Sequence, residues 1–259
     1  TESIGAFDGI LVPFIVTISC IMGAISFALY PEILKNPKRL IDNIQFRYFC
    51  LVAIIGISIY LLTISNDFDS FINQIPDAGF QVLSALTTAG FSTVDLSSLP
   101  DSSKGFLSGL MWIGGSIGST AGGIKIFRII VLAKVIQLIF YNYFLPREAI
   151  TPLKINDHVI ETNEIYTLIS FVILYILTLV VSIFIFMLYN INTMDAIFEV
   201  SSAVGTVGLS AGITDAAMPF TLKLVLCADM LLGRIEIIPL CILLMPRTWV
   251  SRKNKGVKV

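Results

Sequence analysis

Two short segments of this chain have the composition of a backbone that binds cations. They read TTAGFS at residues 87–92 and GTVGLS at residues 205–210, and both combine glycine with hydroxyl and β-branched residues. Such segments favour an extended or mixed backbone over a helix, and Gly90 and Gly208 can adopt positive φ. Extended backbone at membrane depth leaves carbonyl oxygens without partners, and rows of such oxygens can replace the hydration shell of a potassium ion. The segments predict a carbonyl-lined filter; the alternative is two tight turns between spanning helices.

The expected filter includes residues from both segments. The expected filter consists of Thr87, Thr88, Ala89, Gly90, Phe91, Gly205, Thr206, Val207, Gly208 and Leu209. The expected potassium ligands are the backbone carbonyls of Thr88, Ala89, Gly90, Thr206, Val207 and Gly208. Potassium is expected as the substrate, and no covalently bound cofactor is expected.

A third segment, GGSIGSTAGG, separates two apolar runs that otherwise resemble one long helix. Its glycines break the hydrogen-bond ladder of a helix, and its hydroxyls can satisfy freed backbone groups in a wet cavity. We expect a flexible loop that acts as a gate, whereas close helix packing through small residues is the alternative. Its ten residues are Gly114, Gly115, Ser116, Ile117, Gly118, Ser119, Thr120, Ala121, Gly122 and Gly123.

Several charged residues lie in or beside the apolar runs. Arg234 and Glu236 fall in the middle third of the last run, and Asp229 lies five residues before Arg234. Ionisable groups at membrane depth are costly and usually face a bundle interior or a wet cavity. Arg234 could form a purely structural pair with either acid inside the protein. Lys125 and Arg128 follow the glycine-rich segment, either on a solvated helix face or in contact with a gate or a regulatory subunit.

The residue types required by enzymes are poorly represented. The chain has one histidine, which excludes an HExxH zinc site, and its four cysteines have no redox or metal-binding spacing. The glycine-rich segment lacks the Gly-Lys-Ser/Thr ending of a phosphate-binding loop. A serine nucleophile at Ser116 or Ser119 has no apparent base nearby. These observations argue against an enzyme.

The elements that position these residues are membrane helices. The 259 residues are 56% hydrophobic and 14% charged, with a mean hydropathy of +0.88, which is far above the range of soluble domains. Four windows are long enough to cross a hydrocarbon core of about 30 Å: residues 10–30, 49–65, 165–189 and 220–245. The sequence therefore predicts an all-α integral membrane protein in contact with lipid.

Charge is distributed unevenly between the segments that connect the windows. Two connecting segments, residues 66–103 and 190–221, contain acidic residues but neither lysine nor arginine. Residues 31–47, residues 125–154 and the tail from residue 247 are basic. Basic segments remain cytoplasmic, so we expect the C-terminus inside and the acidic segments outside. The net charge of −1 gives no indication of nucleic-acid binding.

An internal repeat links the two filter segments. A shift of 118 residues aligns DAGFQVLSALTTAGFS, from Asp77, with DAIFEVSSAVGTVGLS, from Asp195, and nine of sixteen positions are identical. An apolar run precedes and follows each copy, which predicts two helix–pore loop–helix units of the same direction. Within each copy, residues 78–86 and 196–204 are predicted to form re-entrant half-helices of about nine residues, or roughly 13 Å. The C-terminal, negative end of each half-helix would favour a cation.

These motifs resemble the Trk/Ktr/HKT superfamily of potassium and sodium transporters, which contain four helix–pore–helix units in one chain. TTAGFST and SAVGTVGLSAGIT resemble the filters of the third and fourth units, GGSIGSTAGGIK resembles the loop in the third inner helix, and MLLGRIEIIP resembles the fourth inner helix. The resemblance implies that Arg234 projects beneath the filter as an electrostatic barrier near the gate. It also implies three regions: residues 1–45 as the outer-loop tail and inner helix of a preceding unit plus a cytoplasmic linker, residues 46–150 as the third unit with a broken inner helix, and residues 151–259 as the fourth unit with its basic cytoplasmic tail.

The resemblance also implies partners. Two filter segments cannot close a ring around an ion, so we expect an N-terminal half supplied by another polypeptide or by residues absent from this sequence; completion by a second copy of the same chain is the alternative. The resemblance implies that complete pores lie in the bacterial inner membrane and pair as homodimers. It also implies that they bind a cytoplasmic nucleotide-binding subunit. The implied activity is potassium uptake, with a sodium-selective transporter or a nonconducting regulatory subunit as alternatives.

Overall fold

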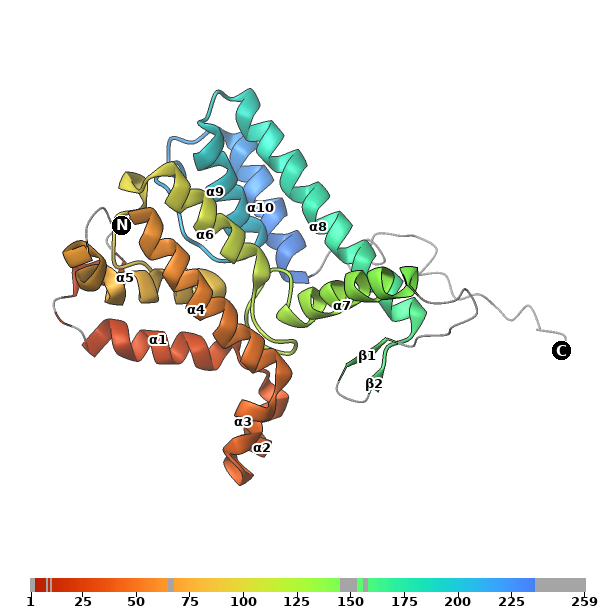
Figure 1. The fold of residues 1–259 in the computed structure, drawn as a ribbon. Coiled ribbons are helices and arrows are strands. Elements are labelled where there is room, and N and C mark those ends of the chain that lie inside the picture. The colour runs from red at the N-terminus through yellow and green to blue at the C-terminus, as the bar shows by residue number, and fades with distance from the viewer. Residues whose placement is uncertain are drawn as a thin grey trace, which may run out of the picture.

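The protein is an all-α membrane protein in which short segments interrupt the helices (Figure 1). The computed structural model describes residues 3–7, 9, 11–64, 68–144, 153–155 and 158–235, without the side chains of residues 68–73, 142 and 158. Its helices are α1 (Leu11–Ala24), α2 (Tyr30–Lys35), α3 (Lys38–Asp42), α4 (Ile44–Ile64), α5 (Phe68–Leu86), α6 (Asp101–Ile113), α7 (Ile126–Tyr143), α8 (Thr162–Leu188), α9 (Thr193–Val204) and α10 (Phe220–Ile235). Short 3₁₀ helices cover Ile4–Ala6, Phe27–Leu29 and Leu96–Ser98, and β1 (Lys154–Ile155) pairs antiparallel with β2 (His158–Val159).

The internal repeat is visible in the order and ends of the helices. In one copy α4 and α5 precede a turn and α6; in the other, α8 and α9 precede a turn and α10. Helix α5 ends at Leu86 and α9 ends at Val204, which are equivalent positions under the 118-residue shift. Helix α6 packs against α9 and so joins the two copies near the turns (Figure 1). The division at residues 45 and 150 stays a prediction.

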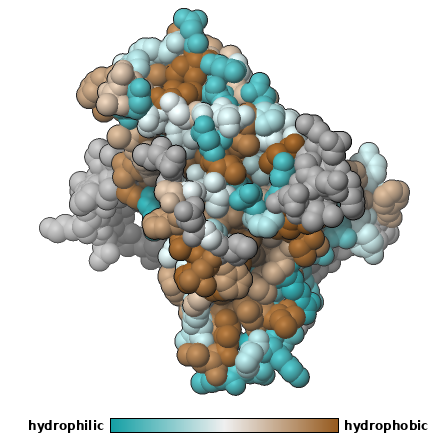
Figure 2. All heavy atoms as spheres, turned by 90° about the vertical axis from the view of Figure 1, so that its left-hand side faces the viewer, coloured by the Kyte–Doolittle hydropathy of each residue, from teal (hydrophilic) through white to brown (hydrophobic). Residues whose placement is uncertain are grey.

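Two of the described helices, α4 and α8, are long and apolar enough to cross a membrane, and the bent pair formed by α1 and residues 27–35 is a further candidate. The windows at residues 49–65 and 165–189 therefore correspond to helices. The fourth window begins with α10, and its remainder lies outside the described residues. Large apolar side chains of both long helices, among them Ile54, Leu62 and Phe184, are exposed on the protein surface. The face shown in Figure 2 carries apolar patches interspersed with hydrophilic residues.

The window at residues 10–30 is not one straight span. Helix α1 ends at Ala24, and residues 27–35 continue at 92° to it. The backbone N–H groups of Ser116 and Thr120 donate to the carbonyls of Ala24 and Gly23, which are therefore held by the glycine-rich segment. Pro31 then occupies the first turn of α2, where its missing N–H costs little. The bend results from contacts with residues about ninety positions away.

The two half-helices are longer than the nine residues predicted. Helix α5 has 19 residues and includes Pro76 in its interior, and α9 has 12 residues. Asn192 starts α9 by accepting a hydrogen bond from the Met194 N–H, 3.3 Å away. Pro76 removes one hydrogen-bond donor from α5 without ending the helix. Both helices still end directly at the two filter segments.

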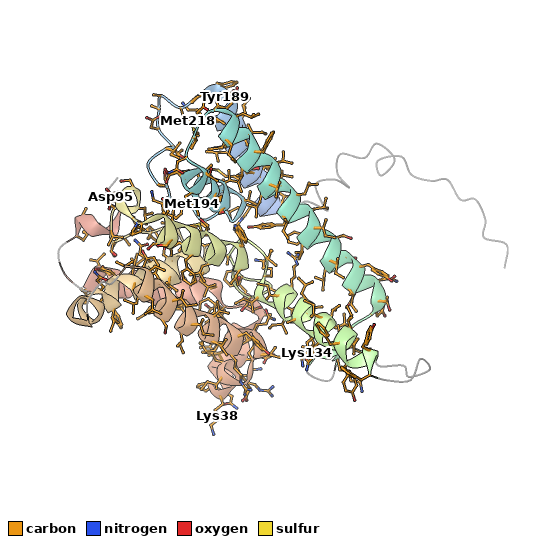
Figure 3. The ribbon with its side chains drawn as sticks, turned by 45° about the horizontal axis from the view of Figure 1, so that its top comes forward. Lys38, Asp95, Lys134, Tyr189, Met194 and Met218 are labelled. Atoms are coloured by element: carbon orange, nitrogen blue, oxygen red, sulfur yellow. The ribbon has the colours of Figure 1, made fainter. Side chains whose placement is uncertain are left out.

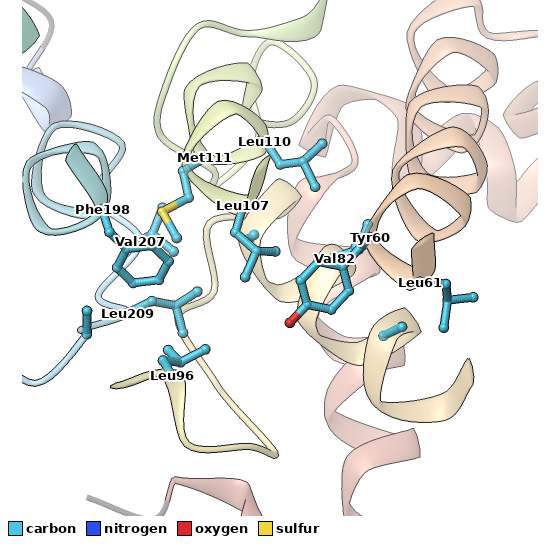
Figure 4. Packing of buried hydrophobic residues seen from close by; sticks show 13 residues of the cluster. Tyr60, Leu61, Val82, Leu96, Leu107, Leu110, Met111, Phe198, Val207 and Leu209 are labelled. Carbon is cyan, nitrogen blue, oxygen red and sulfur yellow. The ribbon is translucent and has the colours of Figure 1, made fainter. Parts of the chain in front are cut away.

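A buried apolar cluster joins the two copies of the repeat (Figure 4). Tyr60 of α4 and Val82 of α5 lie on one side, and Phe198 of α9 and Val207 lie on the other, with Leu107 of α6 between them. All five side chains are at most 5% exposed. The cluster fixes the position of the second turn relative to the helices of the first copy.

Some lysines lie far from the acidic segments of the chain. In Figure 3 Lys38 and Lys134 lie toward the lower edge of the view, whereas Asp95 lies higher. This separation agrees with the sidedness of the sequence; which end faces the cytoplasm stays a prediction.

Candidate functional site

The turns after α5 and α9 have the same backbone conformation. Thr88 and Gly90 have φ values of 55° and 76°, and the equivalent Thr206 and Gly208 have values of 53° and 95°. The positive φ predicted for the two glycines is confirmed. Positive φ at the two threonines was not predicted, because the left-handed region is unfavourable for β-branched residues. Such strain persists only where the surrounding structure enforces it, and it occurs most often at functional sites.

Three backbone hydrogen bonds recur in each turn and account for this conformation. In the first copy the N–H groups of residues 87, 88 and 89 donate to the carbonyls of residues 83, 85 and 84, at 2.8, 3.2 and 3.0 Å. In the second copy the N–H groups of residues 205, 206 and 207 donate to the carbonyls of residues 201, 203 and 202, at 2.9, 3.0 and 2.8 Å. The turns thus satisfy their donors by folding back on the half-helix before them.

A serine on each half-helix binds further backbone groups of the turn. The Ser84 hydroxyl accepts from the Phe91 N–H at 2.9 Å and donates to the Phe91 carbonyl at 2.6 Å. The Ser202 hydroxyl, at the equivalent position, accepts from the Gly208 N–H at 3.0 Å. Each serine is almost fully buried, so both turns are anchored from inside the protein.

Several backbone carbonyl oxygens of the two turns have no hydrogen-bond donor within the described residues. Within the described residues, the carbonyl oxygens of Thr88, Ala89, Gly90, Thr206, Val207 and Gly208 accept no hydrogen bond. These are the six oxygens that the sequence singled out as cation ligands. Most N–H groups of the two turns are bonded, whereas these six acceptors are uncommitted, and uncommitted carbonyl oxygens are groups that can bind a cation.

The side chains of the second turn point away from these oxygens. Val207 and Leu209 lie beside Phe198 and Leu96 in the core and are 5% and 3% exposed (Figure 4). Gly208, between them, is exposed. It lines a hollow of about 460 Å³ that also borders Thr206 and Arg234. The hollow therefore runs along the backbone of the turn.

The two turns touch each other at Gly90. A Cβ atom at this position would lie 2.0 Å from the Val207 carbonyl oxygen, closer than any real contact. Glycine is thus required both for its positive φ and for the approach of the neighbouring backbone. The two filter segments of the sequence form one site.

The predicted break in the third inner helix is confirmed. Helix α6 ends at Ile113, Gly114 has φ 71°, and α7 begins at Ile126. The intervening loop passes directly under both turns. The Gly122 N–H donates to the Thr88 hydroxyl at 2.8 Å, and a Cβ on Gly122 would lie 2.3 Å from the Gly205 carbonyl oxygen.

The tip of this loop is held by three other segments. Besides the contacts with α1, the Ile117 N–H donates to the Gln45 side chain at 2.9 Å. The Arg234 guanidinium donates to the Thr120 carbonyl at 2.7 Å. Ile117, Gly118 and Thr120 are exposed, whereas residues 114–116 and 121–124 are buried. The loop is therefore anchored at both ends and exposed at its tip.

The charged residues near the loop have specific partners. Arg234 forms no ion pair with Asp229 within the described chain; Asp229 instead accepts from the Ser182 hydroxyl of α8 at 2.8 Å, and Glu236 lies outside the described residues. Lys125 donates to the Ala121 carbonyl, which favours loop contact over a solvated face.

Arg128 lies elsewhere, against α8. Its guanidinium carbon lies 3.8 Å from the ring centroid of Phe171, in a cation–π contact. Lys125 and Arg234 instead line a smaller hollow of about 110 Å³ beside Gly122. Two cationic side chains thus lie next to the loop.

A buried ion pair connects the two copies at the other end of α6. The Lys104 ammonium lies 2.8 Å from an Asp195 carboxylate oxygen and also donates to the Ser97 carbonyl at 3.1 Å. The Lys104 side chain is 6% exposed. Nearby, hydrogen bonds from the Ser97 hydroxyl and N–H hold the pKa of the Asp95 carboxyl below its ordinary value.

The sequence of this chain matches a known protein family over most of its length. The model of the TrkH family, described as a cation transport protein, matches residues 1–251. The chain belongs to the TrkH family. The matched residues include both copies of the repeat and the loop between α6 and α7.

Individual relatives of this TrkH-family chain include archaeal and bacterial proteins. An uncharacterized cation transporter of Methanocaldococcus jannaschii is 30% identical over 227 residues, covering 85% of this chain and 45% of the relative. The Trk system potassium uptake protein TrkH of Salmonella typhimurium is 28% identical, covering 95% and 52%. The crystal structure of the potassium transporter TrkH from Vibrio parahaemolyticus superposes with a TM-score of 0.84 at 26% identity, covering 96% of this chain and 55% of that one. The chain spans about half the length of these relatives.

Sequence reasoning missed several residues that shape the site of this TrkH-family chain. The anchoring serines, Ser84 and Ser202, are identical in the repeat alignment and could have been found there. The ion pair of Lys104 could not have been found from the sequence, because its partner Asp195 is 91 residues away. The Thr88 hydroxyl was likewise missed as the acceptor for Gly122, since only the folded loop brings the two together.

Proposed function

We propose that this chain is half of a pore through which potassium ions cross a membrane. The observation that carries the proposal is the set of six carbonyls at residues 88–90 and 206–208, none of which accepts a hydrogen bond within the described chain. In a pore these oxygens replace the hydration shell of the ion, so that entry into the membrane costs little. The potassium uptake named for the bacterial relatives supports this choice of ion.

The two half-helices support the same function. Helices α5 and α9 both end at a turn, so the negative ends of their dipoles lie beside the carbonyls. A helix C-terminus is equivalent to about half a negative charge and stabilises a nearby cation. The turns and the helices before them therefore act together on the ion.

Two turns provide only part of the ring around an ion. Further units, supplied by another polypeptide or by additional residues of this protein, complete the filter. By resemblance to the family, complete pores pair as homodimers and a cytoplasmic nucleotide-binding subunit controls them. The Trk system potassium uptake protein TrkH of Salmonella typhimurium, roughly twice as long as this chain, supports the need for further units.

The glycine-rich loop is proposed as the gate of this pore. It lies beneath both turns and is held by hydrogen bonds to Thr88 and Arg234. Ions can pass only when the loop moves aside, which requires these two bonds to break. The positive charge of Arg234 next to the loop adds an electrostatic barrier to cations.

The test is rescue of cells that lack potassium uptake. The chain is expressed alone and together with a polypeptide that carries the missing units, and growth and ion uptake are measured at limiting potassium. We expect uptake only in the combination. A matched G90A variant places a Cβ 2.0 Å from the Val207 oxygen and is expected to abolish uptake. Uptake by the chain alone would contradict the half-pore, and absence of potassium uptake in a correctly assembled combination would contradict the function; sodium uptake in its place identifies a sodium transporter.

A further inference from the structure

The second turn is tethered by a buried carboxylate that the first turn lacks. Glu199 lies in the middle of α9 and is 4% exposed. One carboxylate oxygen accepts from the Ser210 hydroxyl at 2.6 Å and from the Ala211 N–H at 2.9 Å. The other accepts from the Thr214 hydroxyl at 2.8 Å. All three donors belong to the segment that leaves the turn.

This carboxylate has no ionic partner within the described chain, where Lys104 and Arg47 are the cations found in ion pairs with acids. A buried charge is tolerated only when hydrogen bonds or an opposite charge compensate for its lost hydration. Glu199 receives three such hydrogen bonds, out of about four that a carboxylate can accept. It also lines the 460 Å³ hollow beside Gly208, so its negative charge acts on any cation that enters there.

The equivalent residue in the first copy is neutral and makes no such tether. Gln81 is fully buried, and its amide oxygen and nitrogen have no hydrogen-bond partner within the described chain. At Phe91 the first turn is held by Ser84, and the Thr93 hydroxyl in the segment that leaves this turn donates to the exposed Asp77 carboxylate at 2.9 Å. The two copies therefore contrast a turn tethered by three hydrogen bonds to a buried carboxylate with a turn whose bond to a carboxylate lies at the surface.

The tether completes a clamp around the second row of carbonyls. On one side, Ser202 binds the N–H groups of Val207 and Gly208, at 2.8 and 3.0 Å. On the other side, Glu199 binds residues 210, 211 and 214. The N–H groups that Ser202 binds belong to the same peptide groups as the Thr206 and Val207 carbonyls, and the Gly208 carbonyl lies between the two attachments. Both attachments therefore restrict the movement of these oxygens toward a smaller ion.

We propose that Glu199 is a positioning residue that determines how well the pore discriminates potassium from sodium. The inference rests on the proposed function, since it assumes that the second turn contacts the ion. A clamped row of carbonyls matches one ion size, whereas a released row closes around a smaller ion and lets it pass. Loss of the tether thus raises sodium permeation relative to potassium without removing any oxygen ligand.

The experiment compares variants of the complete transporter, reconstituted in liposomes, by their ratio of potassium to sodium permeability per assembled complex. E199L removes all three acceptor contacts and is expected to lower the ratio at least about tenfold, or about 1.4 kcal/mol. E199Q keeps the shape but weakens the charge-assisted bonds, so the ratio falls by about threefold. D215N makes the same change of carboxylate to amide at an exposed residue next to Thr214, and its ratio stays at the wild-type value.

A second pair of variants separates tethering from general damage. T214V deletes one donor to Glu199 and is expected to lower the ratio by about twofold to threefold. In the E199L background the same change has no further effect, because its acceptor is already gone. If E199L impairs assembly, E199Q and T214V still provide the comparison.

The possible failures are distinct. If wild type passes potassium but E199L and E199Q keep its ratio, the inference on Glu199 is wrong and the proposed function stands. A fall in the ratio for D215N as large as for E199Q also overturns the inference, since charge alone then explains it. If the assembled wild type passes no potassium, the proposed function itself fails.

Discussion

Substitution of Gly122 by alanine tests the gate most specifically, because the structure gives the size of the perturbation. A Cβ at this position would lie 2.2 Å from the Thr206 hydroxyl oxygen and 2.3 Å from the Gly205 carbonyl oxygen. The φ of Gly122 is not positive, so alanine adds bulk without backbone strain. The threonine hydroxyl can rotate, but the Gly205 carbonyl belongs to the backbone of the second turn. The loop itself must therefore retreat, by roughly 1 Å, to reach an ordinary contact distance.

The energy of this retreat has two parts. Overpacking in a well-packed region costs about 1–3 kcal/mol. Retreat also lengthens the 2.8 Å bond from the Gly122 N–H to the Thr88 hydroxyl, whose net contribution is about 0.5–1.5 kcal/mol. Together they destabilise the seated loop by about 1.5–4.5 kcal/mol, which changes the ratio of displaced to seated loop by roughly 10-fold to 1,600-fold.

The assay is potassium flux into liposomes that contain the complete transporter, normalised to assembled complex. G122A is expected to raise flux strongly while assembly stays near wild type. The matched control is G109A on α6, where an added Cβ meets no atom within 4 Å, and its flux is expected to be unchanged. If G122A lowers assembly but leaves the flux of each complex normal, the loop is a packing element and the proposed gate is wrong.

Three further predictions concern charged residues. R234A removes the bond to the loop carbonyl and the positive charge beside it, so potassium flux rises severalfold; unchanged or lower flux contradicts the barrier. K104M removes the cation of the buried ion pair and is expected to lower the free energy of unfolding by about 3 kcal/mol, seen as a lower Tm, whereas K38M at an exposed lysine leaves the Tm unchanged. Since hydrogen bonds from Ser97 lower the pKa of Asp95 in the folded state, their stabilisation is present above the unfolded pKa of about 3.9 and is lost as pH falls through the folded value. The Tm difference between wild type and D95N should therefore shrink below about pH 4; a difference that is constant with pH contradicts this assignment.

Local sequence signals predicted the parts of the site that depend on local chemistry. The glycines at positions 90 and 208 have positive φ, and the helix ends at Gly114, because in each case the glycine permits a conformation that other residues disfavour. The repeat also gave the correct ends of α5 and α9, since the same residue types end both helices. The uncommitted carbonyls lie where the composition of the segments indicated.

Other features depend on contacts between distant residues and could not be predicted. Helix α1 bends after Ala24 because the glycine-rich loop binds its last carbonyls. Thr88 adopts positive φ against its local preference because the half-helix before it and the loop beneath it fix its position. Glu199 differed from Gln81 only by an amide in the sequence, and its role became visible only when its three donors could be named.

The carbonyls of residues 88–90 and 206–208 are proposed to bind potassium. The most direct measurement is a structure of the complete transporter with rubidium or thallium in place of potassium, in which anomalous scattering locates the ion. We expect ion density on the pore axis, in contact with the carbonyl oxygens of Gly90 and Gly208. Ion density confined to other sites, or these carbonyls hydrogen-bonded to the additional units, would contradict it.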